Sequence, residues 1–335
     1  MGENMKIEKI DKNMAQNNSE EKSKCLWIDL NNKYLRGTYA YSGFSRIEEG
    51  IYISEKVEVL KKHTSGINIT FKTDSQRIRI KAKVGGQSYM AHMTAVGQIG
   101  FDLYCKINGR FRFIETTKVN ASEYEVLLLD NLEKEEREFR VYFPLYMRVE
   151  EAYIGIEEQA SFEFIKKEQE KIVIYGTSIS QGGCATRPGM SYSNILDRKL
   201  DYEFINLGFS GSAHMEDRVI DLLNSIDMKY LIIEVESNNT VESMSSKMAN
   251  FINRLEAKNI IVISKFPYPH TMLYPNIRED VYKNKQLQAN LKNITFLDGE
   301  KLLEELDYDD TVDGVHLTDL GFYHLANKLI EYLQD

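Results

Sequence analysis

Apolar residues follow two different spacings in the two halves of the chain. Between Leu26 and about Phe164, β-branched and aromatic residues recur in short runs, such as "GINITFKTDSQRIRIKAKV" and "REFRVYFPLY", with Gly, Asn, Asp and Ser between them. In "RIRIKAKV" the apolar residues alternate strictly with arginine and lysine, which predicts a strand with one buried face. We therefore expect an antiparallel β-sandwich with a jelly-roll-like arrangement over residues 26–165.

After the charged connector "KKEQEK", apolar runs alternate with amphipathic segments long enough for helices. The expected strands are 172–175, 204–208, 230–235, 260–264 and 294–298. Nearly continuous apolar strands separated by helices are typical of a parallel sheet that is covered on both faces. Residues 166–335 are therefore predicted to form a flavodoxin-like three-layer α/β domain around a five-stranded parallel sheet. Its reactive groups should lie beyond the carboxyl ends of the strands.

Charge and hydropathy exclude two classes of partner. The 335-residue chain has a formal net charge of −9, and its lysines and arginines form no basic block, which argues against nucleic acid as a partner. No apolar run is long enough to span a bilayer, so a membrane is not expected as a partner either. Residues 1–25 are polar, without periodicity or a signal-peptide pattern, and are predicted to be a mobile tail of a cytosolic protein.

Cysteine and histidine spacing indicates no metal site. The chain has three cysteines, Cys25, Cys105 and Cys184, without a CxxC pair, and six histidines without an HExxH arrangement. We expect reduced thiols, with Cys184 a small buried side chain, and neither a metal nor another cofactor. The glycines in "YGTSISQGG" lack both the GxGxxG and the GK[ST] patterns, so a nucleotide site is not predicted.

Polar residues and glycines follow the predicted strands. The first strand is followed by Ser178, the second ends at Gly208, the third is followed by Asn238 and Asn239, and the last loop contains Asp313 and His316. Because the carboxyl ends of parallel strands meet at one edge, we expect these groups to converge there. Such a set is suited to acyl transfer through a serine nucleophile.

Each member of this set has a chemical role in such a reaction. His316 would accept the Ser178 proton, and Asp313 would orient the imidazole and stabilise its charged form. The expected oxyanion donors are the backbone N–H groups of Ser178 and Gly208 and the side-chain amide of Asn238, with Asn239 as the alternative amide. Gly208 suits this role because a residue without a side chain lets a substrate approach the backbone.

The sequence gives less support for a functional role of the other polar residues. Arg187 follows the nucleophile loop and is a candidate for substrate binding, although a solvated arginine beside Pro188 would look the same in sequence. Packing and turn formation explain His92 and Asp102 equally well, so neither is placed in the catalytic set. Glu236 precedes the candidate amide closely and is expected to point away from the oxyanion, since a negative charge there would oppose catalysis.

Four ordered segments resemble one family of esterases. "GTS", "NLGFSG", "ESNN" and "DGVHLTDLG" resemble the conserved blocks of the SGNH or GDSL-like esterases. "GFDLY" at residues 100–104, together with "EREFRVYFPLY", is similar to the β-sandwich domain that precedes the catalytic domain in one subgroup. The resemblance covers about residues 26–333. It implies an SGNH hydrolase fold, the serine, glycine, asparagine and Asp-x-x-His roles given above, and carbohydrate esters as the substrate class.

The predicted function is a serine esterase that removes a short acyl group, acetyl in the first place, from a hydroxylated substrate. An acyltransferase with the same site is the alternative, because sequence does not reveal whether water or another acceptor receives the acyl group. A non-catalytic carbohydrate-binding protein is an alternative of a different class. Whether the sandwich contributes to the site, and how many copies assemble, stay open at this point.

Overall fold

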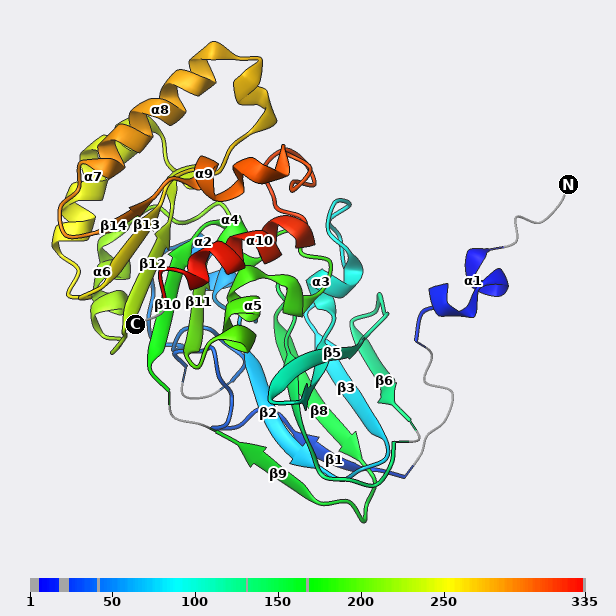
Figure 1. Ribbon diagram of the computed structural model, residues 1–335. Coiled ribbons are helices and arrows are strands. Elements are labelled where there is room, and N and C mark those ends of the chain that lie inside the picture. The colour runs from blue at the N-terminus through cyan, green and yellow to red at the C-terminus, as the bar shows by residue number, and fades with distance from the viewer. Residues whose placement is uncertain (1–5, 18–23, 41–42, 131, 167–168, 334–335) are drawn as a thin grey trace, which may run out of the picture.

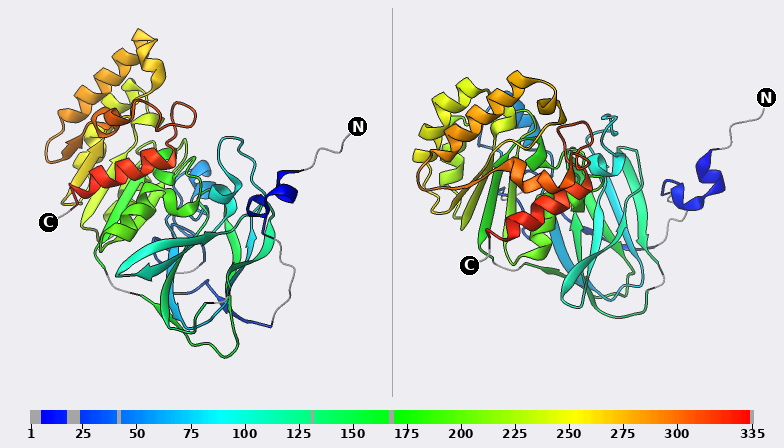
Figure 2. Two further views of the ribbon diagram at one scale, coloured as in Figure 1. Left: turned by 45° about the vertical axis from the view of Figure 1, so that its right-hand side comes forward. Right: turned by 45° about the horizontal axis from the view of Figure 1, so that its top comes forward.

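The computed structural model describes residues 6–17, 24–40, 43–130, 132–166 and 169–333. Figures 1 and 2 show two bodies side by side, a β-sandwich and a layered α/β domain, with the short helix α1 (Ile7–Ile10) outside the sandwich. Within the predicted tail, residues 6–17 form α1 and the 3₁₀ turn η1 (Lys12–Met14), and Asn17 exchanges two hydrogen bonds with Lys118. Residues 1–5 and 18–23 of that tail lie outside the described residues.

Two antiparallel sheets form the sandwich, as the alternating pattern predicts. One has the strand order β1-β8-β3-β6 and the other β5-β4-β7-β2-β9. In sequence order these strands are β1 (Leu26–Asp29), β2 (Asn68–Thr73), β3 (Ile78–Val84), β4 (Asp102–Ile107), β5 (Arg110–Thr116), β6 (Glu123–Leu129), β7 (Arg137–Tyr142), β8 (Val149–Ile156) and β9 (Phe162–Ile165). The apolar side chains of β3 are buried, and Arg79 on its other face pairs with Glu125 of β6 at 3.3 Å.

The second half contains the predicted five-stranded parallel sheet. Its strand order is β11-β10-β12-β13-β14, and every pairing is parallel. The strands are β10 (Lys171–Gly176), β11 (Glu203–Gly208), β12 (Tyr230–Glu234), β13 (Ile260–Ile263) and β14 (Thr295–Leu297). Each lies within one or two residues of its predicted range, because an uninterrupted apolar run is needed where both faces of a sheet are covered.

Helices cover both faces of this sheet. The described helices are α2 (Glu55–Leu60), α3 (Ala95–Ile99), α4 (Ser178–Gln181), α5 (Tyr192–Lys199), α6 (Asp217–Asn224), α7 (Val241–Asn253), α8 (Pro275–Ala289), α9 (Gly299–Leu303) and α10 (Asp319–Ile330). Ile172 and Ile174 of β10 pack with α5, α9 and α10, whereas Val173 and Tyr175 pack with α6 and α7. The result is the predicted three-layer arrangement, with α10 in front of the sheet in Figure 1.

The amino-terminal half contributes residues to both hydrophobic cores of the α/β domain. Ile47, Ile53 and Val57, which precede the first long strand of the sandwich, pack with α6 and α7 of the α/β domain. Leu145 and Tyr146 pack on the opposite side with α5 and α10. The amino-terminal half therefore covers part of the α/β domain as well as forming the sandwich.

A buried charge cluster crosses the same contact. The Asp197 carboxylate of α5 accepts hydrogen bonds from Arg140 Nη1 at 2.6 Å and from the Tyr142 hydroxyl at 2.7 Å, both on β7. Arg36 Nη2 lies 3.5 Å away on the other carboxylate oxygen. Burial alone would raise the pKa of Asp197, but the Arg140 and Arg36 guanidiniums lower it below its ordinary value. Asp197 is therefore held as a carboxylate between two arginines of the other body.

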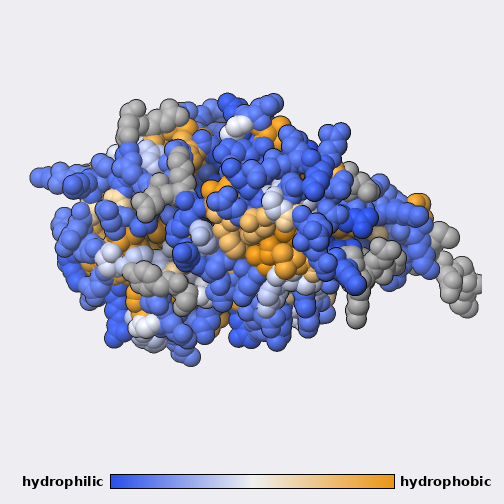
Figure 3. Space-filling view, turned by 90° about the horizontal axis from the view of Figure 1, so that it is seen from below, coloured by the Kyte–Doolittle hydropathy of each residue, from blue (hydrophilic) through white to orange (hydrophobic). Residues whose placement is uncertain are grey.

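The outer surface is mostly polar. The face seen in Figure 3 is predominantly hydrophilic, with an apolar area near its centre. Among the described helices, none combines the length and the apolar character needed to cross a membrane.

Removing the Asp197 carboxylate should be far more costly than removing an exposed one. In Asp197→Ala two arginines stay buried without their partner, so the free energy of unfolding should fall by about 3–5 kcal/mol. Asp130, which pairs with Arg77 at 2.6 Å while 37% exposed, is the matched control, and Asp130→Ala should cost less than about 1 kcal/mol. Urea unfolding of both variants measures the difference, and equal losses would contradict the bracing role of Asp197.

Candidate active site

Helix α4 presents Ser178 directly beyond the end of β10. Thr177 is the N-cap of this helix, and its Oγ1 accepts the Ile179 N–H at 3.2 Å. A Cβ on Gly176 would lie 2.1 Å from Ser180 Oγ, and one on Gly208 would lie 2.2 Å from Gln181 N. Glycine is therefore required at both strand ends, because the Ser180 side chain packs on Gly176 and the backbone of α4 packs on Gly208.

Ser178, His316 and Asp313 form a continuous chain of hydrogen bonds. His316 Nε2 lies 2.9 Å from Ser178 Oγ, and His316 Nδ1 lies 2.8 Å from Asp313 Oδ2. The other carboxylate oxygen of Asp313 accepts the backbone N–H groups of Val315 at 3.0 Å and His316 at 2.8 Å. The loop before α10 thus fixes both Asp313 and His316, opposite the helix that carries Ser178.

The environment of Asp313 keeps it charged. Partial burial would raise its pKa, but hydrogen bonds from the His316 amide and ring and from the Val315 amide lower it below the ordinary value. An ionised carboxylate can only accept a hydrogen bond, so the His316 Nδ1 that faces Asp313 must carry the proton of the neutral ring. Nε2 is then the acceptor that faces the Ser178 hydroxyl.

The expected role of Gly208 does not fit its contacts. The Gly208 N–H donates to Asn206 Oδ1 at 2.8 Å within the buried end of β11, so it is not available to a substrate. Gly211, three residues into the following loop, is exposed and has a φ of +63°. Among the described residues, its N–H has no acceptor, and no atom apart from its chain neighbours lies within 4 Å of where a Cβ would be. Gly211 therefore replaces Gly208 as the glycine candidate for the oxyanion hole.

The two asparagines after β12 differ in what their side chains contact. Asn239 Nδ2 donates to the carbonyls of Ala213 at 2.7 Å and Val235 at 2.8 Å, and its Oδ1 accepts the Ser243 hydroxyl. Asn238 Oδ1 accepts the Ala213 N–H at 3.1 Å, which leaves its Nδ2 without an acceptor among the described residues. Asn239 is therefore used to join two loops, and Asn238 has a side-chain donor left for a substrate.

Two buried glutamates, Glu234 at the end of β12 and Glu236 two residues later, have different contacts. Glu234 Oε2 accepts hydrogen bonds from the Thr177 N–H at 3.2 Å, the Thr177 hydroxyl at 2.7 Å and the Ser180 hydroxyl at 3.0 Å. Burial raises the pKa of Glu234 to about 7, against the opposing effect of these hydrogen bonds. Glu236 Oε2 instead accepts from the Lys265 N–H and Gln288 Nε2, on the side of β13 and α8. Glu234 thus fixes Thr177, the N-cap residue of α4.

Arg187 contacts the sandwich. Its Nη1 donates to Asp102 Oδ2 at 2.7 Å and to the Tyr104 hydroxyl at 2.6 Å, and its guanidinium lies 3.8 Å from the centre of the Phe113 ring. The same Asp102 oxygen accepts the Gly189 N–H at 2.8 Å. The predicted substrate-binding role of Arg187 does not fit these contacts, which join the nucleophile loop to β4 and β5.

Buried polar side chains that sequence reasoning did not single out support the oxyanion loop. Gln181 Oε1 accepts the Ser210 N–H at 3.0 Å, while its Nε2 lies 3.1 Å from His63 Nδ1. Burial, followed by the charge of Arg46, lowers the pKa of His63 to about 4. Arg46 Nη1 donates to the Gly208 carbonyl at 2.6 Å. These contacts join residues that are distant in sequence, so no local sequence motif predicts them.

The sandwich half reaches the triad itself. His92 lies between β3 and α3, and its Nε2 is 3.9 Å from Asp313 Oδ2. Its ring centroid is 5.8 Å from that of His316. Cys184, in the loop after α4, is buried, and burial followed by the Asp313 charge raises the pKa of its thiol to about 12. The edge of the active site is therefore made by both bodies.

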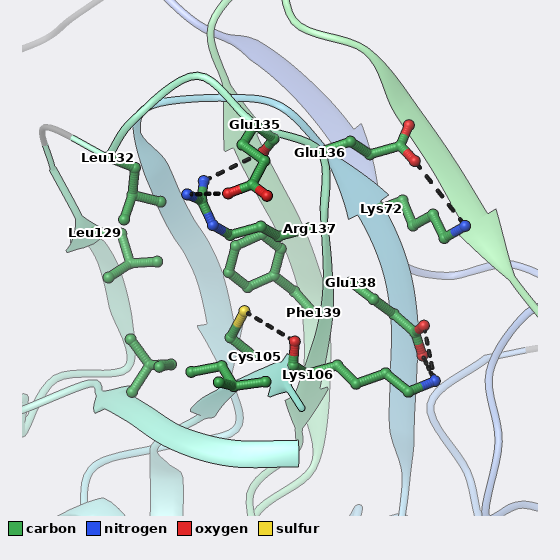
Figure 4. Close-up of a pocket in the computed structure, with 12 residues that line it drawn as sticks. Lys72, Cys105, Lys106, Leu129, Leu132, Glu135, Glu136, Arg137, Glu138 and Phe139 are labelled. Atoms are coloured by element: carbon green, nitrogen blue, oxygen red, sulfur yellow. Dashed lines mark hydrogen bonds and ion pairs between the residues drawn. The ribbon is translucent and has the colours of Figure 1, made fainter. Parts of the chain in front are cut away.

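A separate cavity of about 520 Å³ lies within the sandwich, away from the triad. Figure 4 shows its lining, which includes the apolar side chains of Leu129, Leu132 and Phe139. Each charged residue that lines it has an oppositely charged partner, in the pairs Lys72–Glu136, Lys106–Glu138 and Arg137–Glu135. The cavity has the size of a small-molecule site but brings together no groups suited to ester chemistry.

Two family models match the chain. The GDSL-like lipase/acylhydrolase family matches residues 169–334, and a domain described as the N-terminus of Esterase_SGNH_hydro-type matches residues 25–162. The comparison with curated proteins finds no match.

Solved structures share the whole architecture. A GDSL-like lipase from Bacteroides ovatus is 30% identical, with a TM-score of 0.86 over 92% of this chain and 97% of that one. A salicylyl-acyltransferase from a tetracycline biosynthetic pathway is 15% identical, with a TM-score of 0.71 over 92% and 96%. An acetyl xylan esterase from Butyrivibrio proteoclasticus is 12% identical, with a TM-score of 0.54 over 93% and 98%. The last two similarities are likenesses of fold.

The lipase similarity extends over nearly the full length of both chains, and the family matches cover both bodies in order. The chain therefore belongs to the GDSL-like lipase/acylhydrolase family, as a carboxylic ester hydrolase of the SGNH type with a GxDLY amino-terminal domain.

Proposed function

We propose that this chain hydrolyses short-chain esters, acetyl esters first, of hydroxylated carbohydrate substrates through an acyl-enzyme on Ser178. The observation that carries the proposal is the hydrogen-bond chain from Ser178 Oγ through His316 to Asp313, at 2.9 and 2.8 Å. A hydroxyl within hydrogen-bond distance of an unprotonated imidazole nitrogen is a nucleophile with its base in place.

Acylation begins when Ser178 Oγ attacks the ester carbonyl carbon. His316 Nε2 takes the hydroxyl proton, and the Asp313 carboxylate stabilises the imidazolium without taking a proton itself. When the tetrahedral intermediate collapses, His316 gives this proton to the leaving alcohol. The alcohol departs, and the acyl group stays on Ser178.

Three donors are assigned to the oxyanion of this intermediate: the N–H groups of Ser178 and Gly211 and the Nδ2 of Asn238. The Ser178 N–H belongs to the first residue of α4 and has no partner within the helix. Among the described residues, the Gly211 N–H and the Asn238 Nδ2 have no acceptor. Donors that are already aligned stabilise the developing charge without reorganising during the reaction.

Deacylation repeats the same steps with water. His316 again acts as the base, now for a water molecule that attacks the acyl carbon, and Ser178 leaves with the returned proton. The carbohydrate and acetyl parts of the proposal are supported by the resemblance of the motifs and by the shared fold of an acetyl xylan esterase.

Acyl transfer is the second candidate, supported by the shared fold of a salicylyl-acyltransferase. The triad would act identically as far as the acyl-enzyme, and an acceptor hydroxyl would take the place of water. The two functions separate experimentally by the ratio of new ester to free acid, because transfer to an added alcohol acceptor exceeds hydrolysis only in the second case.

Replacing the nucleophile should abolish both turnover and labelling. Wild-type protein should hydrolyse acetyl esters faster than octanoyl esters in a chromogenic series and should react with a serine-directed phosphonate. Ser178→Ala should lose at least about 10³-fold in kcat and all labelling. The neighbouring Ser180→Ala, whose hydroxyl contacts Glu234, is the control and should still be labelled. A folded wild type with neither turnover nor labelling would contradict the esterase and favour the carbohydrate-binding alternative.

The adjacent asparagines offer a second matched pair. Asn238→Ala should lower kcat by about 10²–10³-fold with little change in KM, since it removes a donor used in the transition state. Asn239→Ala should instead lower the unfolding temperature, because it breaks hydrogen bonds at 2.7 and 2.8 Å to two backbone carbonyls. Steady-state kinetics and thermal unfolding of both variants decide the assignment, and the reverse pattern would exchange the two roles.

Glu234 should make stability depend on pH. Its pKa of about 7 in the folded chain exceeds the ordinary value of 4.5, so its contribution to stability is complete below about pH 4.5 and is lost as pH rises through 7. Between pH 5 and 8, wild type should therefore lose stability relative to Glu234→Gln, by at most about 1.4 kcal/mol per pH unit. Urea unfolding across this range measures the difference, with phosphonate labelling as the check that α4 is intact. A pH-independent difference would show that Glu234 does not titrate there.

A further inference from the structure

Four side chains, two of them members of the triad, bring atoms that can bind a metal close together. His92, Cys184, Asp313 and His316 each offer one ligand atom, and these atoms all lie within 4.8 Å of one another. His92 comes from the sandwich half, Cys184 from the loop after α4, and the other two from the loop before α10. The set therefore exists only where the two bodies meet.

The spacing is close to that of a tetrahedral site. His92 Nε2 is 3.9 Å from Asp313 Oδ2, which is 2.8 Å from His316 Nδ1. Zinc bonds of about 2.0–2.3 Å place neighbouring ligand atoms about 3.3–3.8 Å apart, so shifts of about 1 Å or less complete the geometry. His92 is 44% exposed, which leaves its ring free to make such a shift.

The chemistry of the set selects one class of cation. A thiolate, two imidazoles and one carboxylate are ligands that Zn²⁺ accepts in tetrahedral geometry. Hard cations such as Mg²⁺ and Ca²⁺ require more oxygen ligands than this set contains. On binding, the Cys184 thiol would release its proton to solvent, because the thiolate is the ligand.

The backbone at Cys184 supports a function for this side chain. Cys184 has a φ of +72°, the left-handed region that residues other than glycine rarely occupy. Cys184 lies between Gly182, which has a φ of +97°, and Arg187, which Asp102 holds. Backbone strain of this kind clusters at functional sites.

We propose that His92, Cys184, Asp313 and His316 bind one Zn²⁺ ion and that the bound ion switches the esterase off. His316 uses one ring nitrogen for Asp313 and the other for Ser178. Coordination through either nitrogen breaks one of these links, so the metal-bound triad lacks a competent base. The binding step stands by itself, and only its inhibitory effect rests on the proposed function.

Local spacing gives no sign of this site. The sequence expectation of no metal rests on the absence of ligand pairs a few residues apart, whereas here only Asp313 and His316 are close in sequence. Folding brings the other two ligands to them from separate segments.

The test titrates metal-free protein with Co²⁺ and follows the absorbance. A tetrahedral site with a thiolate ligand should give charge-transfer and d–d bands that saturate at one ion per chain and disappear when Zn²⁺ displaces Co²⁺. Ester hydrolysis is measured in parallel and should fall by at least about 100-fold as the site fills with Zn²⁺, then recover with a chelator. Mg²⁺ and Ca²⁺ should have no effect.

Variants assign the ligands. Cys184→Ala should abolish the charge-transfer band, and His92→Ala, at a position that is 44% exposed, should raise the half-inhibiting Zn²⁺ concentration at least about tenfold. Each rate is compared with the metal-free rate of the same variant. Cys105→Ser, a buried cysteine of β4 in the sandwich, is the control and should bind and respond as wild type does.

The outcomes separate this proposal from the esterase itself. Hydrolysis that zinc does not inhibit, or inhibition that both ligand variants leave unchanged, would overturn the proposal while the esterase stands. Cobalt bands that depend on Cys184, in a protein that hydrolyses no ester, would support the metal site and overturn the proposed function instead.

Discussion

The buried carboxylate of Asp102 is the contact on which the geometry of the active edge depends. Asp102 lies at the start of β4 and is fully buried. Its Oδ2 accepts hydrogen bonds from Arg187 Nη1 at 2.7 Å and from the Gly189 N–H at 2.8 Å. A buried carboxylate is costly unless it is paired in this way, so the sandwich and the nucleophile loop are fixed to each other. Within that loop, Gly183 lies so close to His316 that a Cβ would be 3.0 Å from its ring. The loop that packs against His316 is therefore held by a residue of the other body.

Buried polar side chains also fix the loop of Gly211 and the N-terminus of α4. Gln181 aligns the loop that carries Gly211, and it is held in turn by the Leu145 carbonyl and by His63, both from the amino-terminal half. Glu234 fixes the cap of α4 from the other side. Gln181 and Glu234 are themselves buried, so their hydrogen bonds leave the backbone around Ser178 little freedom. Donors for an oxyanion must be aligned before the charge develops, and this support provides such alignment.

Sequence patterns predicted the strands and the order of the chemical groups because both follow from local rules. Apolar runs such as 172–175 must be strands if both faces are covered, and residues at the carboxyl ends of parallel strands must converge. The role expected of Gly208 was wrong because its N–H is already used by Asn206, which a motif does not reveal. Arg187 was expected near substrate because it lies in the loop after Ser178. Its partner, Asp102, lies in the other body, so the sequence did not reveal this ion pair. What sequence did not provide was the pairing of distant segments, which also brings His92 to the triad.

Shared burial makes the two bodies one structural unit. Leu145 and Tyr146 complete the core beneath α5 and α10, Ile47 and Ile53 complete the one beneath α6 and α7, and Asp197 is neutralised by arginines of the sandwich half. Separating the bodies would expose both apolar surfaces and leave buried charges on each side without partners. A binding module attached by a linker has no such requirement, because its contacts with the catalytic domain are few and polar. The sandwich here is therefore one scaffold with the α/β domain, and both halves of the sequence build the surface around Ser178.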